Sequence, residues 1–93
     1  MIGMCGYKSF QTDYVAIEEG NGIGDDNSKT LNECETFCSQ TGGCKSFALC
    51  GSNCHLKDKM FNGDESTKEN VGCTTYYYTC APGTYQCIQL NAF

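Results

Sequence analysis

The chain has 93 residues, nine of them cysteines, and carries 11 acidic against 6 basic residues for a formal net charge of −5. This acidic balance, with no basic cluster, argues against nucleic acid as a partner, and the lack of any run of about 18 apolar residues argues against membrane insertion. A domain this small removes only about 60 to 65 per cent of its unfolded surface from water, so the cysteines predict a disulfide-rich scaffold.

The cysteine content and the N-terminus both bear on where the chain works. Disulfides persist where the medium is oxidising, so we expect an extracellular or secreted protein, or a cell-surface part of a larger one. The N-terminal sequence MIGMCGYKSF lacks the charged region and apolar run of a signal peptide, which favours a mature or excised module. We expect residues 1–93 to form a single domain.

The first third of the chain predicts short strands followed by a loop. Residues 7–17 are rich in aromatic and β-branched side chains, which indicates one or two short strands. Residues 18–29 carry three glycines, two asparagines and four carboxylates, which is typical of an exposed loop. Asp25, Asp26 and Asn27 are consecutive and lack the alternating ligand spacing of an EF-hand, so we predict no calcium site there.

A helix should follow this loop. Thr30 and Glu33 have the T-x-x-E spacing of a capping box. We therefore expect a helix over residues 31–41, after which two consecutive glycines can adopt the left-handed conformation that ends helices. Cys34 and Cys38 lie on one stripe of that helix, so both thiols should face whatever the helix packs on.

The remaining segments predict a sheet. Residues 45–50 and 54–60 indicate two short strands joined by a three-residue hairpin connection. Residues 61–70 form a polar excursion, and residues 73–80 are a β-prone run bounded by cysteines. The order predicts an α+β fold in which one helix packs on an antiparallel β-sheet. Residues 81–93 begin just before the only proline and should be a C-terminal tail or an edge extension.

The density of cysteines around the only histidine raises the question of a metal site. Paired zinc ligands usually recur as two closely spaced pairs, and no C-x2-C pair occurs in this chain. The closest local matches are two C-x3-C spacings. We therefore predict no metal and no cofactor from the available pool of ligands, which comprises Cys34, Cys38, Cys44, Cys50, Cys54 and His55.

A catalytic interpretation would pair a cysteine with His55. Cys54 and His55 are adjacent on an expected strand, so their side chains should point to opposite faces. The sequence also lacks a C-x-x-C redox motif, a G-x-S-x-G motif and a glycine-rich phosphate loop. We expect no enzymatic activity and no catalytic residue.

Cross-linking accounts best for the spacing, and here the residues resemble a known family. The pattern C-x3-C-x5-C-K-S-F-A-L followed by C-H-L-K, with flanking cysteines at 5 and 80, is similar to the PAN/apple module. The resemblance covers residues 5–80, which would form the core of the domain. It implies one helix on an antiparallel sheet and three nested disulfides, pairing Cys38 with Cys44, Cys34 with Cys54, and Cys5 with Cys80.

Three cysteines lie outside that pattern. If the apolar side chains of residues 45–50 face the helix, strand alternation turns Cys50 to the outer face, together with Cys73 and Tyr77. Cys50 and Cys73 are then candidate partners, and Cys87 is left unpaired or linked to another chain. A bulge at Cys50 would reverse its direction. The alternative joins Cys87 to Cys73 and leaves Cys50 odd.

The PAN/apple resemblance implies a binding or adhesion module that recognises extracellular carbohydrate or protein without catalysis. The chain has six tyrosines, whose aromatic rings could stack on sugar rings. We predict Tyr77, on the outward side of its strand, and Tyr85 as ligand contacts. The alternative function is a structural subunit of an extracellular filament, coat or matrix. It would self-associate through edge strands, through Cys87 or through the apolar C-terminal tail, and the odd cysteine count favours it.

Overall fold

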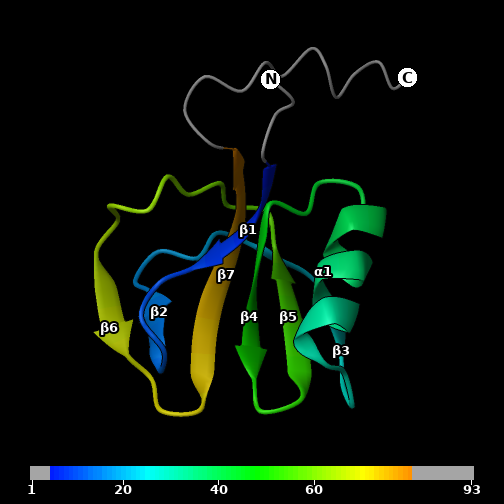
Figure 1. Cartoon of the computed structure of the whole chain (residues 1–93), viewed down its shortest axis with the longest axis horizontal. Coiled ribbons are helices and arrows are strands. Elements are labelled where there is room, and N and C mark those ends of the chain that lie inside the picture. The colour runs from blue at the N-terminus through cyan, green and yellow to red at the C-terminus, as the bar shows by residue number, and fades with distance from the viewer. Residues whose placement is uncertain (1–4, 81–93) are drawn as a thin grey trace.

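An antiparallel sheet of five strands, with one helix on one of its faces, dominates residues 5–80, the part of the chain that the computed structural model describes (Figure 1). A second, two-stranded antiparallel sheet pairs β2 (Tyr14–Ala16) with β6 (Thr67–Glu69). The arrangement belongs to the expected α+β class. Across the large sheet the strands run in the order β1 (Cys5–Ser9), β7 (Cys73–Cys80), β4 (Ser46–Cys50), β5 (Asn53–Lys57) and β3 (Gly22–Asp26).

The helix α1 (Leu31–Gln40) begins where the capping box predicts. The Thr30 hydroxyl accepts the backbone N–H of Glu33 at 3.3 Å, and the Glu33 carboxylate accepts the N–H of Thr30 at 2.9 Å. The helix ends with Thr41 as its C-cap, and Gly43 follows in the left-handed region with φ of 84°. At ten residues, α1 falls well short of what a bilayer crossing requires, and it is the only helix in residues 5–80.

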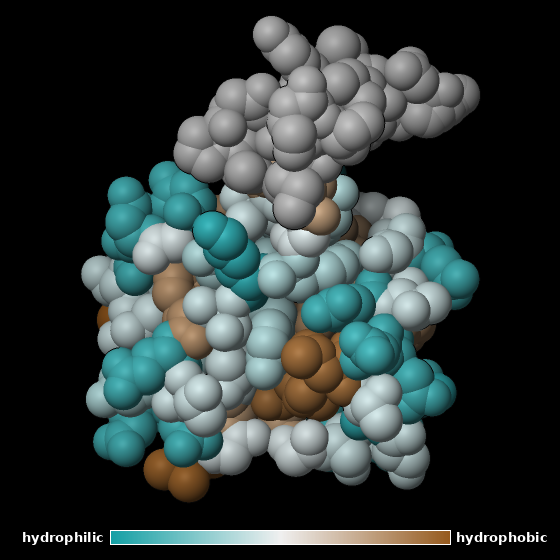
Figure 2. Space-filling model, in the orientation of Figure 1, coloured by the Kyte–Doolittle hydropathy of each residue, from teal (hydrophilic) through white to brown (hydrophobic). Residues whose placement is uncertain are grey.

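The core on the helix side of the sheet joins side chains from α1, β4 and β5. Phe47 and Leu56 are fully buried there beside the two helix cysteines. The Phe47 ring also stacks on Tyr76 of β7 at 5.3 Å between centroids. One short helix does not cover this face completely, since Leu31 and Leu49 stay half-buried. Figure 2 accordingly shows a large apolar patch beside the lower ends of β4 and β5.

The opposite face of the sheet is covered by the β2–β6 pair and the chain next to it. The Thr75 hydroxyl accepts the backbone N–H of Ala16 at 3.1 Å, which fastens β2 to β7. A second buried cluster joins Ala16, Phe61 and Tyr77, with Phe10 packed against it. The molecule is therefore built from three layers: helix, large sheet and small sheet.

This third layer makes the prediction of an exposed Tyr77 wrong. Alternation along β7 does turn Tyr77 away from the helix, as expected. However, its side chain is only 6 % exposed, because the rings of Phe10 and Phe61 pack against it at 4.9 and 6.2 Å between centroids. Gly63 closes over the Tyr77 hydroxyl at φ of 106°, and a Cβ there would lie 2.8 Å from that oxygen.

Two segments predicted to be irregular contain strands. The expected loop over residues 18–29 includes β3, which pairs with β5 at the edge of the large sheet through an irregular register. The expected polar excursion over residues 61–70 includes β6, and Phe61 at its start is buried. The hairpin between β4 and β5 has two connecting residues rather than three, with Gly51 at φ of 63°.

Four disulfides cross-link the described residues. Cys34 and Cys38 tie the two halves of α1 to β5 and to the segment before β4, and Cys50 lies directly opposite Cys73 on the outer face, 4.0 Å between Cα atoms. Tyr85, Cys87 and the expected tail over residues 81–93 lie outside the described residues. The pairs coincide with those expected from the resemblance and from strand alternation: Cys5–Cys80, Cys34–Cys54, Cys38–Cys44 and Cys50–Cys73.

Candidate functional site

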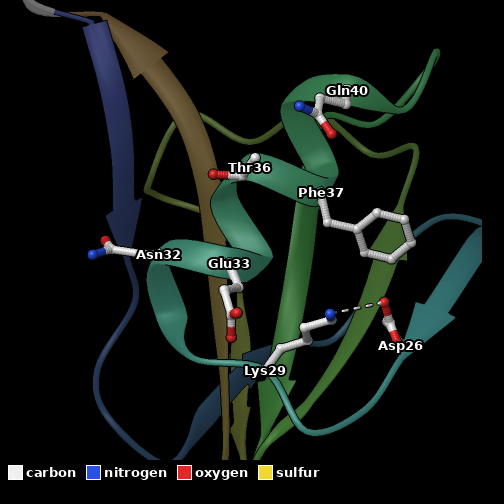
Figure 3. Close-up of a pocket in the computed structure, with 7 residues that line it drawn as sticks. All are labelled: Asp26, Lys29, Asn32, Glu33, Thr36, Phe37 and Gln40. Carbon is white, nitrogen blue, oxygen red and sulfur yellow. Dashed lines mark ion pairs between the residues drawn. The ribbon is translucent and has the colours of Figure 1, made fainter.

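Two grooves flank the helix, and the first runs along its outer face (Figure 3). It has a volume of about 340 Å³. Its charged groups are already paired, because the Lys29 ammonium lies 3.5 Å from the Asp26 carboxylate and the Glu33 carboxylate caps the helix. A ligand would meet mainly neutral side chains there. The groove is lined by Asp26, Lys29, Asn32, Glu33, Thr36, Phe37 and Gln40.

The second groove, which we call the tyrosine groove, lies between the last turns of α1 and the ends of β1 and β7. Its volume is about 430 Å³, within the usual range for small-molecule sites. Unlike the first groove, it contains a strongly exposed apolar side chain, Met60, and an exposed aromatic one, Tyr78, and its lysine, Lys45, takes part in none of the ion pairs of residues 5–80. It is lined by Tyr7, Cys38, Ser39, Thr41, Cys44, Lys45, Met60 and Tyr78.

Tyr78 is the exposed aromatic residue of this groove, with 43 % of its surface open to solvent. Strand alternation turns it to the helix side of the sheet, opposite to Tyr77. Tyr7 faces it across the β1–β7 pair, and the two rings meet edge to face at 5.3 Å between centroids. The Tyr7 hydroxyl is in turn hydrogen-bonded to the Ser39 hydroxyl at 3.1 Å. This chain of contacts holds the Tyr78 ring in place.

The rest of the groove is fixed by a disulfide and by backbone bonds. The Cys38–Cys44 bridge joins the end of α1 to the segment that leads into β4. Met60, 65 % exposed, lies in the chain after β5 and supplies apolar surface. The Thr41 hydroxyl donates to the carbonyl of Phe37 at 2.7 Å, so its lone pairs remain open to a ligand donor.

The electrostatics of the groove are those of neutral hydroxyls beside one cation. Partial burial raises the pKa of Tyr7, and the negative charge of Glu35 raises it further against the opposing effect of the Ser39 hydrogen bond. The Tyr7 hydroxyl is therefore protonated at neutral pH and can donate. The cation is Lys45.

The residues considered for catalysis and metal binding are separated by the fold. Cys54 is joined to Cys34 in the core, while His55 points to the other face and lies 2.8 Å from the Asp25 carboxylate. The described residues contain no group of three or more histidine, cysteine, aspartate or glutamate side chains arranged to hold a metal ion.

The chain matches no protein-family model, and neither curated proteins nor solved structures give a significant match.

Of the two predicted ligand contacts, Tyr77 is buried and Tyr85 lies outside the described residues. The residue that the sequence analysis missed is Tyr78, which alternation placed with Tyr76 on the helix side. The missing information was which strands of the sheet the helix covers. The helix packs on β4 and is bridged to β5 by Cys34–Cys54, so β7 and β1, which lie towards the other edge of the sheet, extend beyond it (Figure 1).

Proposed function

We propose that this chain is an extracellular binding module of the PAN/apple kind, which recognises carbohydrate or protein and catalyses no reaction. The cysteine pattern over residues 5–80, the nested disulfides and the packing of one capped helix on an antiparallel sheet all support this assignment. Four disulfides in so short a chain also favour an oxidising, extracellular setting.

The tyrosine groove is the observation that carries the proposal. Tyr78 offers an aromatic face and Met60 an apolar side chain, and both are exposed at the same groove. Hydroxyls of Tyr7, Ser39 and Thr41 surround them. An exposed aromatic ring with hydrogen-bonding groups at its edge is typical of sites that bind sugars or protein side chains.

The part of the proposal that excludes catalysis is supported by the oxidation state of the cysteines. All eight cysteines of residues 5–80 are in disulfides. A disulfide sulfur has no thiolate to act as a nucleophile.

Glycan and protein arrays test the proposal. We expect the wild-type chain to bind a ligand that the Tyr78→Ala variant loses while keeping its fold. Val71→Ala is the matched control, because Val71 is also an exposed apolar residue, at 76 %, but lies in the turn before β7. Binding that survives Tyr78→Ala, or that Val71→Ala abolishes equally, would contradict the assignment of the groove.

The second candidate function is a structural subunit that assembles through disulfides between chains. The observation in its favour is parity, since the four disulfides use eight of the nine cysteines and leave Cys87. Sizing of the protein under non-reducing conditions tests it. A covalent dimer or polymer that disappears in Cys87→Ser supports this function, whereas a wild-type monomer counts against it.

A further inference from the structure

Lys45 gives the tyrosine groove a positive charge that is not neutralised by any ion pair within residues 5–80. The ion pairs of that part of the chain join Lys29 to Asp26, His55 to Asp25 and Lys57 to Glu19. The side chain of Lys45 takes part in none of them and is exposed at the groove. Lys45 is also the one charged residue among those that line the tyrosine groove, so the groove presents a positive charge in a protein of net charge −5.

The backbone of Lys45 is hydrogen-bonded to a neighbouring segment through both its N–H and its carbonyl, so the position from which its side chain extends is fixed. Its N–H donates to the carbonyl of Lys57 at 3.0 Å, and its carbonyl accepts the N–H of Tyr78 at 3.2 Å. Lys45 and Tyr78 are thus neighbours across the β4–β7 pair, one step beyond the pairing of Ser46 with Tyr77. Side chains at such positions emerge on the same face, with Cβ atoms about 5 Å apart.

An ammonium group beside an exposed tyrosine ring matches a ligand with a carboxylate attached to an apolar-faced ring. We infer that the tyrosine groove binds an acidic sugar, a pyranose that carries a carboxylate, with the carboxylate on Lys45 and the C–H face of the ring on Tyr78. This inference rests on the proposed function of the groove as a binding site. Charge-assisted hydrogen bonds of this kind are about twice as strong as neutral ones.

The rim of the groove favours a sugar over an acidic peptide. Ser39 and Tyr7 hydrogen-bond to each other through their hydroxyls, and the Thr41 hydroxyl donates to a backbone carbonyl. Each hydroxyl oxygen keeps unused acceptor capacity at the mouth of the groove. Acceptors set around an aromatic face suit the several hydroxyl donors of a sugar ring, whereas a peptide side chain presents few.

Glu35 on α1 works against an anion at this site. Its charge acts on Tyr7, where it raises the pKa of the hydroxyl. The same charge repels a bound carboxylate. Glu35→Gln should therefore strengthen the binding of an acidic sugar by up to about threefold, the size of a screened surface interaction.

The test is an NMR titration of the 93-residue chain with methyl glycosides of glucuronic acid and galacturonic acid, against methyl glucoside and methyl galactoside as their neutral partners. We expect at least one acidic sugar to bind about tenfold more tightly than its neutral partner and to shift the amide signals of Lys45 and Tyr78. Added salt should reduce that preference.

Three variants complete the experiment. Lys45→Gln should remove the preference for the acidic sugar, and Tyr78→Ala should abolish binding of both kinds of sugar. Lys68→Gln, which removes an exposed lysine of β6, should leave binding unchanged. Equal affinity for neutral and acidic sugars, or an acidic preference that survives Lys45→Gln, would overturn the inference.

The remaining outcomes separate this inference from the proposed function. A neutral sugar or an acidic peptide that binds through Tyr78 without an acidic-sugar preference would overturn the inference and leave the binding function standing. Failure of sugars, peptides and arrayed proteins alike to bind at Tyr78 would overturn both.

Discussion

Tyr77 and Tyr78 are adjacent on one strand, β7, yet their surroundings differ sharply. Tyr77 is 6 % exposed beneath the small sheet, whereas Tyr78 is 43 % exposed at the rim of the helix layer. The strand geometry does not explain this difference, since alternation along β7 simply directs Tyr77 to one face of the sheet and Tyr78 to the other. The difference arises from what packs on each face of the sheet. The exposure of a side chain on β7 therefore depends on whether the helix or the small sheet extends over it, and alternation along the strand does not decide it.

The two covering layers are held by different forces. The helix layer is short and covalently anchored, with two disulfides running from α1 to the sheet and its neighbouring chain. The small-sheet layer is held by packing of Phe10, Phe61 and Tyr77 and by the hydrogen bond from Ala16 to Thr75. Removing a disulfide should therefore destabilise the helix layer, whereas removing an aromatic side chain should destabilise the small-sheet layer.

The largest effect should come from the covalent anchor of the helix. Replacing Cys34 and Cys54 together by alanine removes a fully buried bridge, and we expect a loss of about 3 to 5 kcal/mol in the free energy of unfolding. Chemical denaturation measures it. The double variant Cys50→Ala/Cys73→Ala should cost less, since that bridge is only half-buried. Equal losses from the two pairs would contradict a special role for the helix anchor.

The next effect separates the two tyrosines. Tyr77→Ala should cost about 3 kcal/mol because it opens a cavity between Phe10 and Phe61. Tyr78→Ala should cost less than about 1 kcal/mol, because much of its ring is already in water. Thermal or denaturant unfolding of the two variants side by side provides the measurement. The reverse order would mean that the small sheet does not cover Tyr77 in solution.

A smaller effect should come from the start of the helix. Thr30→Ala removes the acceptor for the Glu33 amide, and we expect a loss of about 1 kcal/mol. Thr36→Ala is the control, because Thr36 is exposed in the middle of the same helix, where alanine is the better helix former. A neutral result for Thr30→Ala would show that the disulfides alone hold the helix end.

The smallest effect should come from acidification, through two carboxylates: Asp58 at an edge of the large sheet, and Glu65 in the chain that leads into β6. The N–H groups of Asn21 lower the pKa of Asp58 at the β3–β5 edge. Burial alone would raise the pKa of Glu65, but the backbone N–H groups of Asn62 and Gly63 lower it overall. Both carboxylates therefore stabilise the fold above their ordinary pKa values, 3.8 and 4.5, and lose that contribution as pH falls through the folded values.

Thermal unfolding between pH 7 and pH 3 tests this pair. The wild-type melting temperature should fall once the pH drops below about 4.5. Asp58→Asn and Glu65→Gln should each start lower at neutral pH and lose less on acidification. A variant with an unchanged pH dependence would exclude its carboxylate as a source of the acid sensitivity.

Much of the helix layer could be predicted from the sequence, because its signals are local or paired. Thr30 and Glu33 mark the start of α1, and the spacing of Cys34 and Cys38 fixes the face that it presents. The resemblance to the PAN/apple pattern supplied the partners of these cysteines. Strand alternation over residues 73–80 made Cys73 a candidate partner of Cys50, and the structure pairs the two.

The small-sheet layer was harder to predict because one of its two strands, β6, carries little β propensity. The sequence of β6 is Thr-Lys-Glu, and it becomes a strand only by pairing with β2. Phe61 follows Met60 in an otherwise polar stretch, and nothing in the local sequence indicates that Phe61 is buried while Met60 is exposed. Without this layer, alternation alone made Tyr77 appear to face solvent, and the same reasoning hid the exposure of Tyr78.

The Cys5–Cys80 bridge has a mechanical consequence. It joins the first residue of β1 to the last residue of β7, which lie side by side with Cα atoms 3.9 Å apart. A pulling force applied to the chain before Cys5 and after Cys80 passes through this covalent link, and the 74 residues between the two cysteines carry none of the load. The tyrosine groove, whose lining residues all lie between these two cysteines in the sequence, would thus stay folded under such tension for as long as that one bond stays oxidised.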